Sequence, residues 1–242
     1  MSNQPRRPRR RSRAEQLAEV ARLLAEQPGT VAPDRLLTYL EHYFRHADNS
    51  VLLTRPSGQI AHSIRHHAQL GRRRQPGQSH LELFTPVLAE QGWDADGHTV
   101  LTLVTDDKPW LIDTVTEALN AQGWSLRELV HPQFQVLRDA EGLLVDVGTR
   151  DDERPMLAEA WVWIELYPPL GASAAESSPQ LMEDLHAGLA DLDAANQDAV
   201  DMRERMVATA RQAAAANHPQ AAVAAEMLDW LADDRVLLLG AR

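Results

Sequence analysis

Three acidic residues form the sharpest polar cluster in the sequence. Asp106 and Asp107 come directly after the apolar run 99–105, and Asp113 follows a few residues later. At a turn between a strand and a helix, these carboxylates are suited to bind the ammonium group of an effector or a cation. A helix start also prefers them, because carboxylates satisfy the free N–H groups of the first turn and interact favourably with the helix dipole. We favour helix capping with a solvated face, and we retain Asp106, Asp107 and Asp113 as candidate effector-binding residues.

Other polar patterns give no catalytic or metal site. His62 and His66 have the i, i+4 spacing that can hold a metal on a helix, but no glutamate lies between them as the H-E-x-x-H hydrolase motif requires. We interpret them, together with His67, as surface histidines. The sequence contains no G-x-S-x-G nucleophile motif and no cysteine that would supply a thiolate. We therefore assign no catalytic residue and no metal ligand.

Two tryptophans, Trp161 and Trp163, share one face of the segment 159–167, in which apolar residues alternate as in a strand. A monomer rarely leaves two such rings in water, since exposed apolar patches usually mark contacts. We expect this face to pack either under the domain's own helices or against another domain, and the sequence leaves both alternatives open. Both tryptophans are candidate interface residues.

The acidic cluster lies between a predicted strand and a predicted helix. Residues 99–105 are rich in β-branched side chains and predict a buried strand. The Asp-Asp-Lys-Pro sequence that follows is typical of a helix start. The helix is expected over 109–122, because apolar residues recur there every three to four positions, and Gly123 is its expected C-terminal cap.

Extended segments follow this helix. One runs over 126–137 and is interrupted by His131-Pro132, because a proline cannot donate a hydrogen bond within a sheet. Shorter strands are expected at 143–147 and 159–167. The order of strand, helix, extended segment, strand and helix is typical of an α+β fold. It resembles the βαββαβ sandwich of the ACT domains, with N-terminal and C-terminal helices flanking it.

The helical flanks suggest a division of the chain. Within them, the pattern predicts a helix at Ser57–Leu70, a loop at 71–79 with three arginines and a Ser/Ala-rich linker at 171–179. The expected regions are a disordered arginine-rich tail at 1–13, a helical region at 14–78, an ACT-like core at 79–170, a helical extension at 171–234 and the truncated start of a following domain at 235–242.

Composition restricts the class of protein. A hydrophobic share of 44 % supports a folded core. Without the six arginines of residues 1–13, the chain has 18 basic and 35 acidic residues, a net charge of −17. We expect no nucleic-acid partner for so acidic a body, because phosphate binding needs a basic face. The sequence contains no apolar run of the roughly 20 residues that a membrane helix needs, and no secretory signal. A cytoplasmic protein is therefore expected.

The stretch TLVTDDKPWLIDTVT, residues 102–116, resembles the N-terminal region of the large NAD-specific glutamate dehydrogenases. In that family a strand runs into an Asp-Asp-x-Pro-aromatic-Leu-x-Asp-x-Val segment. Further matching segments occur in the family's order, and the resemblance spans about residues 35–242. These segments are Tyr43-Phe44-Arg45-His46, Arg74-Gln75-Pro76-Gly77, Ala121-Gln122-Gly123-Trp124, Val130-His131-Pro132, Arg138-Asp139-Ala140-Glu141-Gly142, residues 159–166 and Trp230-Leu231-Ala232-Asp233-Asp234.

The resemblance implies that the chain is the first ACT-like domain of such an enzyme, with flanking helices. The parent would convert glutamate and NAD to 2-oxoglutarate, ammonia and NADH in a domain further along its chain. No G-x-G-x-x-G follows a strand here, so we expect no cofactor in this chain, and NAD only in the parent. The expected role is non-catalytic, in regulation or assembly of a homo-oligomer through contacts with the parent's remaining domains or subunits. The alternative is a free-standing ACT-type amino-acid sensor.

One departure from the ACT pattern bears on this choice. Many effector-binding ACT domains carry Pro-Gly at the turn between the first strand and the first helix. Here Pro109 is followed by Trp110, whose ring would fill the space that a ligand needs. We expect Trp110 to pack against a neighbouring domain, which makes it a third candidate interface residue.

Overall fold

The computed structural model describes residues 11–27, 29, 31–148, 156–216, 218 and 220–233. The chain forms two compact units. One comprises Met1–Asp107 and Leu119–Gln180, and the other comprises Lys108–Ala118 and Leu181–Arg242. Residues 1–10 of the expected tail and all of the expected start of a following domain at 235–242 lie outside the described residues.

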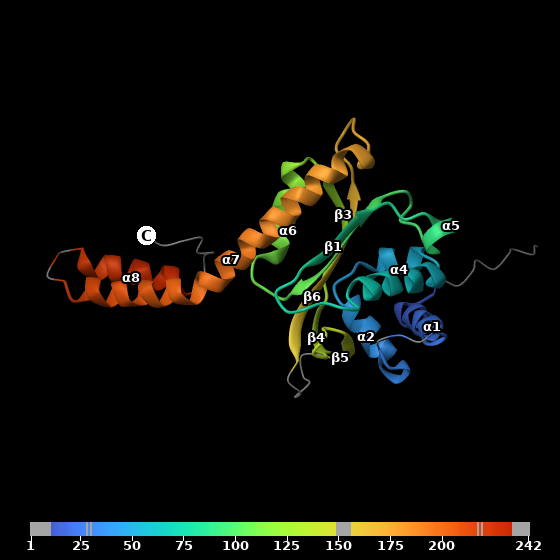
Figure 1. The fold of residues 1–242 in the computed structure, drawn as a ribbon, viewed down its shortest axis with the longest axis horizontal. Helices are drawn as coiled ribbons and strands as arrows, with labels where there is room; N and C mark the ends of the chain where they lie inside the picture. Colours follow the sequence, from blue (N-terminus) through green and yellow to red (C-terminus); the bar gives the residue numbers. More distant parts are fainter. Residues whose placement is uncertain are drawn as a thin grey trace, which may run out of the picture. The chain divides into compact units, whose positions relative to one another are not determined.

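Helices precede and follow the strands along the chain (Figure 1). The helices are α1 (Arg13–Ala25), the 3-10 turn η1 (Pro33–Arg35), α2 (Leu36–Tyr43), α3 (Asn49–Thr54), α4 (Ser57–Leu70), α5 (Leu88–Gln91), α6 (Leu111–Ala121), α7 (Ala174–Ala214) and α8 (Ala221–Ala232). The strands are β1 (His80–Phe84), β2 (Thr99–Asp106), β3 (Ser125–Val130), β4 (Gln133–Arg138), β5 (Leu144–Gly148) and β6 (Leu157–Tyr167). None of the described helices has the length and apolar character that crossing a membrane requires.

The strands form one sheet in the order β1-β2-β6-β4-β5, and β3 also pairs with β6. Each of these pairings is antiparallel. The extended segment expected over 126–137 is indeed broken at His131-Pro132, and its two halves, β3 and β4, lie along the same side of β6. Val130 pairs with Trp163 and Gln133 pairs with Ala160. The predicted α+β, ACT-like fold is confirmed.

The N-terminal helices share a hydrophobic core with one face of the sheet. Leu17 of α1, Leu40 of α2 and Ile64 of α4 belong to the same buried cluster as Trp161 and Trp163 of β6. Figure 1 shows these helices, drawn in blue to cyan, gathered beside the sheet. The helical region expected at 14–78 and the core expected at 79–170 therefore share buried side chains.

β6 is buried on both of its faces. Ala160, Val162, Ile164 and Leu166 point to one face and have no exposed surface. Trp161 points to the other, as expected for a strand in which successive side chains alternate. An eleven-residue strand that is buried on both sides must neutralise any charge it carries, and this requirement governs the polar site described below.

The second unit contains most of α7, which extends further towards its N-terminus than the sequence predicted. The linker expected at 171–179 is mostly helical, since α7 begins at Ala174 and includes Pro179. Ser173 and Glu176 explain this start, because Ser173 N donates to the Glu176 carboxylate at 3.0 Å and Glu176 N donates to Ser173 Oγ at 3.3 Å. This capping box satisfies free N–H groups of the first turn. Leu181, Leu185, Leu189 and Leu192 form a buried apolar stripe along α7.

His67 lies inside the core of the first unit, and its prediction as a surface histidine is wrong. It shares the buried stripe of α4 with Ile60 and Ile64. Its Nε2 lies 3.2 Å from the carbonyl oxygen of Leu103, which can only accept, so Nε2 donates. Nδ1 then accepts from the Tyr43 hydroxyl at 2.6 Å. Burial removes the hydration of an imidazolium ion and lowers the pKa of His67 to about 4.

This lowered pKa predicts that the chain loses stability in mild acid. In the unfolded chain the pKa of a histidine is about 6.5, so the unfolded state takes up a proton as the pH falls below that value. The stabilisation is present above pH 6.5 and is lost as the pH falls toward the folded-state pKa of about 4. We expect His67 to lower the free energy of unfolding by about 2 kcal/mol between pH 7 and pH 5. Urea denaturation of the wild type and of His67→Gln at both pH values measures this, and equal pH dependence in the two proteins would contradict it.

Candidate functional site

Two carboxylates face each other where β2 ends and β6 begins. Asp106 pairs with Glu159 across the ladder, and like charges directly opposite each other destabilise a sheet. Arg74 resolves the conflict, because its Nη2 lies 2.6 Å from Asp106 Oδ1 and 2.6 Å from Glu159 Oε1. Arg74 and Glu159 have no exposed side-chain surface.

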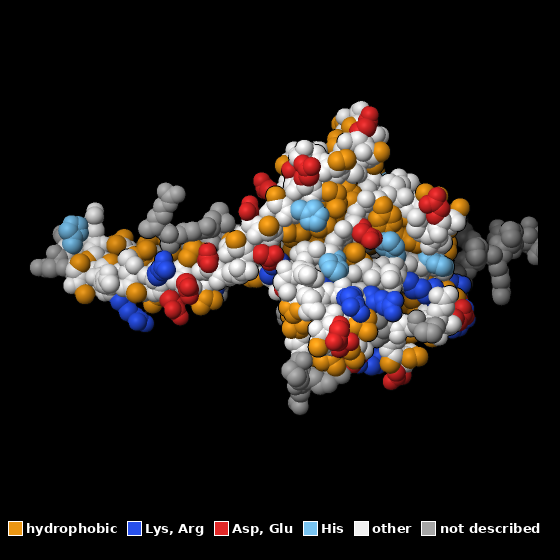
Figure 2. Space-filling view, viewed as in Figure 1, with side chains coloured by type: hydrophobic (Ala, Val, Ile, Leu, Met, Phe, Trp, Pro, Cys, Tyr) orange, Lys and Arg blue, Asp and Glu red, His pale blue; other side chains and the backbone are white. Residues whose placement is uncertain are grey.

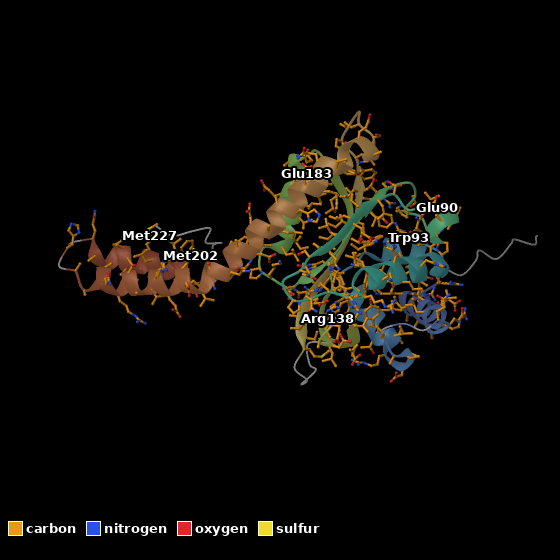
Figure 3. The ribbon with its side chains drawn as sticks, in the orientation of Figure 1. Glu90, Trp93, Arg138, Glu183, Met202 and Met227 are labelled. Atoms are coloured by element: carbon orange, nitrogen blue, oxygen red, sulfur yellow. The ribbon has the colours of Figure 1, made fainter. Side chains whose placement is uncertain are left out.

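Arg138 of β4 binds the same glutamate. Its Nε lies 2.6 Å from Glu159 Oε1 and its Nη2 lies 2.9 Å from Glu159 Oε2, which is the two-pronged geometry that binds a carboxylate strongly. Trp161 Nε1 also donates to Glu159 Oε2, at 3.1 Å. Figure 3 shows Arg138 at the end of the sheet that carries β4 and β5. We call Arg74, Asp106, Arg138 and Glu159 the Glu159 network.

Backbone groups take up the remaining hydrogen-bonding capacity of this network. Arg74 Nη1 donates to the carbonyl of Gln78 at 2.8 Å, and Arg138 Nη2 donates to that of Gly71 at 2.9 Å. Gly77 N donates to Asp106 Oδ2 at 2.7 Å. The network thereby ties the segment between α4 and β1, which the sequence predicted as a loop, to the strands.

A glycine is required where the β4–β5 turn meets this segment. Gly142 has φ +79°, in the left-handed region that favours glycine. A Cβ atom at Gly142 would lie 2.6 Å from the carbonyl oxygen of Arg74. The backbone of the turn therefore packs directly against the backbone of Arg74, and a side chain at residue 142 would not fit.

A second ionic cluster lies further along β6. Glu165 is buried and pairs with two arginines, Arg55 and Arg127. The guanidinium carbon of Arg55 lies 5.3 Å from the ring centroid of Trp163, within the range of a cation–π contact. Both glutamates of β6 are thus neutralised by arginines from outside the strand.

Trp110 has an unusual backbone conformation. Its φ is +66°, a left-handed value that costs a bulky residue on the order of 1–3 kcal/mol. Its carbonyl accepts from Thr114 N at 2.9 Å and from Thr114 Oγ1 at 2.9 Å. The positive φ explains why α6 begins at Leu111 and not at Pro109, as the sequence predicted. The side chain is 40 % exposed.

Comparison with known proteins identifies this domain. Residues 39–189 match the family described as glutamate dehydrogenase, ACT1 domain. The chain belongs to this family. The NAD-specific glutamate dehydrogenase of Halomonas elongata is 26 % identical over 178 residues, which is 68 % of this chain and 10 % of that protein. That of Pseudomonas aeruginosa is 22 % identical over 156 residues, 64 % of this chain and 10 % of that protein. The ACT1 chain thus spans about a tenth of the length of these relatives.

The acidic residues singled out from the sequence of the ACT1 chain have different surroundings. Asp106 belongs to the Glu159 network. Asp107 accepts from Gln133 Nε2 at 2.9 Å, and its own N–H donates to the carbonyl of Ala158 at 2.9 Å. Asp113 belongs to the second unit, in the first turn of α6, where it is exposed. The structure therefore places Asp106 in an ion pair and Asp107 in a hydrogen bond between strands.

The tryptophans also differ from one another. Trp161 and Trp163 are buried in the core shared with the N-terminal helices, which corresponds to the alternative that this face packs under the domain's own helices. Trp110 alone of the three is exposed, with 40 % of its surface accessible.

Sequence reasoning missed the Glu159 network because its arginines lie in segments that were taken as solvated loop and turn. The available signal was a glutamate in a strand flanked by apolar residues, since a buried carboxylate requires a cationic partner. Three segments that carry the family resemblance, those beginning at Arg74, Arg138 and Glu159, meet in this network.

The ACT1 domain does not fit NAD at the end of β2. Asp107 follows this strand, and its carboxylate would repel a pyrophosphate. Dinucleotide-binding folds also use a mostly parallel sheet with a glycine-rich turn, whereas the pairings here are antiparallel.

Replacing Arg74 tests the importance of the Glu159 network. Arg74→Met keeps much of the side-chain volume but leaves Asp106 without its arginine and Glu159 with one arginine. Breaking a buried ion pair from one side costs about 3–5 kcal/mol, and we expect a loss of that order in the free energy of unfolding by urea. Arg72→Met, at an exposed position two residues earlier, is the matched control and should change it by less than about 0.5 kcal/mol. Similar losses in both variants would contradict a specific role for Arg74.

Proposed function

We propose that this ACT1 chain is a non-catalytic regulatory and assembly segment of an NAD-dependent glutamate dehydrogenase. The parent reaction converts glutamate and NAD to 2-oxoglutarate, ammonia and NADH. Membership of the ACT1 family and the much greater length of the relatives support this proposal. The segment acts through contacts with the remaining domains or subunits, in a homo-oligomer.

The proposal depends mainly on the backbone conformation and the exposure of Trp110. A large ring is held at a backbone angle that glycine would accept without strain, and 40 % of its surface is exposed. Strained residues concentrate at functional sites, and exposed aromatic rings are common anchors of protein interfaces. Trp110 thus has the properties of a contact residue at the turn where other ACT domains bind effectors.

The hydrogen-bond partners of the acidic residues favour a role in contacts between domains or subunits over effector binding. The Asp106 carboxylate already bonds Arg74 and Gly77 N, and Asp107 Oδ1 accepts from Gln133. An effector's ammonium group would have to compete with a buried guanidinium for Asp106. Effector binding by Asp106, Asp107 and Asp113 stays a prediction.

Self-association of the chain tests the role of Trp110. We expect concentration-dependent association in sedimentation velocity experiments, weakened at least tenfold in Trp110→Gly, because interface anchors commonly contribute more than about 1.4 kcal/mol. Glycine also relieves the backbone strain, so the variant should fold. Leu126→Ala, which shortens a side chain that is 44 % exposed on β3, is the control and should associate as the wild type does. Equal association of all three proteins would contradict the role of Trp110.

The proposed lack of catalysis is tested directly. The purified chain, supplied with glutamate and NAD, should form no NADH by absorbance. Sustained turnover would overturn the assignment of catalysis to another part of the parent. Tight binding of an amino acid in calorimetry would favour a free-standing sensor instead.

A further inference from the structure

A small basic pocket lies between the end of α2 and the β3–β4 connection. Its volume is about 180 Å³, and a single water needs roughly 10–15 Å³ of cavity volume, so the pocket has room for a small ion. The lining residues are His42, Arg45, His46, His131, Pro132 and Gln133. No acidic side chain is among these lining residues, although the chain as a whole has a net charge of −11.

Two ring nitrogens at this pocket are buried without a hydrogen-bond partner. They are His42 Nδ1 and His131 Nε2, within the part of the chain that the structure describes. His42 Nε2 lies 2.6 Å from the carbonyl oxygen of Gln133 and must donate to it. Buried polar atoms without partners are rare and commonly mark the place of a water or an ion.

The cationic charge beside these rings is not neutralised by the described residues. Arg45 is exposed and makes no side-chain hydrogen bond or ion pair among them. Figure 2 shows several arginine side chains close together on the part of the surface between the positions of α2 and α4 in Figure 1. An unpaired guanidinium beside three imidazoles attracts an anion and repels a cation.

α2 ends at the pocket, and the carbonyl end of a helix repels anions. Arg13 donates to the carbonyl oxygens of Phe44 and Ala47 and so places a cation at this helix end. Burial lowers the pKa of His131, and the negative charge of Asp107, whose Oδ1 accepts from Gln133 Nε2, acts in the opposite direction.

We propose that this pocket binds a small oxyanion, of the phosphate or carboxylate type. Arg45, whose side chain is exposed, would hold it through charge-assisted hydrogen bonds, and the exposed ring of His46 would donate a further hydrogen bond. The site is formed by the end of α2 and by two of the segments that carry the family resemblance, residues 43–46 and 130–132. It goes beyond the proposed function, because binding by this chain requires neither a parent enzyme nor an oligomer.

A metal ion fits the pocket less well than an anion. Among the described residues, no group of three or more His, Asp or Glu side chains is placed to hold a metal. Arg45 would also repel a cation from the same space.

Titration calorimetry of the full chain with inorganic phosphate and, separately, with succinate tests the proposal. At least one of the two should bind at a single site, and which one binds identifies the type of oxyanion.

Variants separate this pocket from general charge attraction. Arg45→Gln/His46→Gln changes two exposed side chains, so the variant should fold as the wild type does by circular dichroism. It should weaken binding at least tenfold. Arg72→Gln, a matched change of charge outside the pocket, should leave the affinity within twofold. The proposal is overturned if neither ion binds, or if Arg72→Gln weakens binding as much as the double variant does.

Discussion

The buried charge of Glu159 is the constraint on which the rest of this structure depends. Glu159 lies near the start of β6, a strand that is buried on both faces, and an unpaired carboxylate there would be costly. Arg74 reaches it from the segment before β1 and Arg138 from β4. Neutralising this one group therefore fixes the relative positions of β4, β6 and the α4–β1 connection, which are far apart in the sequence.

Much of the fold could be predicted because it follows from local periodicity. Short stretches of sequence were enough to predict the break at His131-Pro132, the helix Ser57–Leu70 and the strand alternation of residues 159–167. The resemblance to the glutamate dehydrogenases identified the family, although no single segment of it was decisive.

What could not be predicted depends on contacts between distant residues. Arg74 begins one of the segments that carry the family resemblance, but the segment gave no sign that Arg74 is fully buried while Arg72 is exposed. His67 was taken as a surface residue for its type, although its position on the stripe of α4 indicated burial. The positive φ of Trp110 likewise contradicts the preference of its side chain, and no rule of spacing or composition predicts such strain.

The bend at His131-Pro132 has a consequence for the order of folding. β3 and β4 together line one side of β6, and β2 lines the other. Among the strands that the structure describes, β6 is the last to be synthesised. Until residue 167 has left the ribosome, β2, β3 and β4 lack the strand with which all three pair, although β2 can already pair with β1 and β4 with β5. Such non-local pairing slows folding, and it leaves open strand edges that are prone to aggregation on the nascent chain.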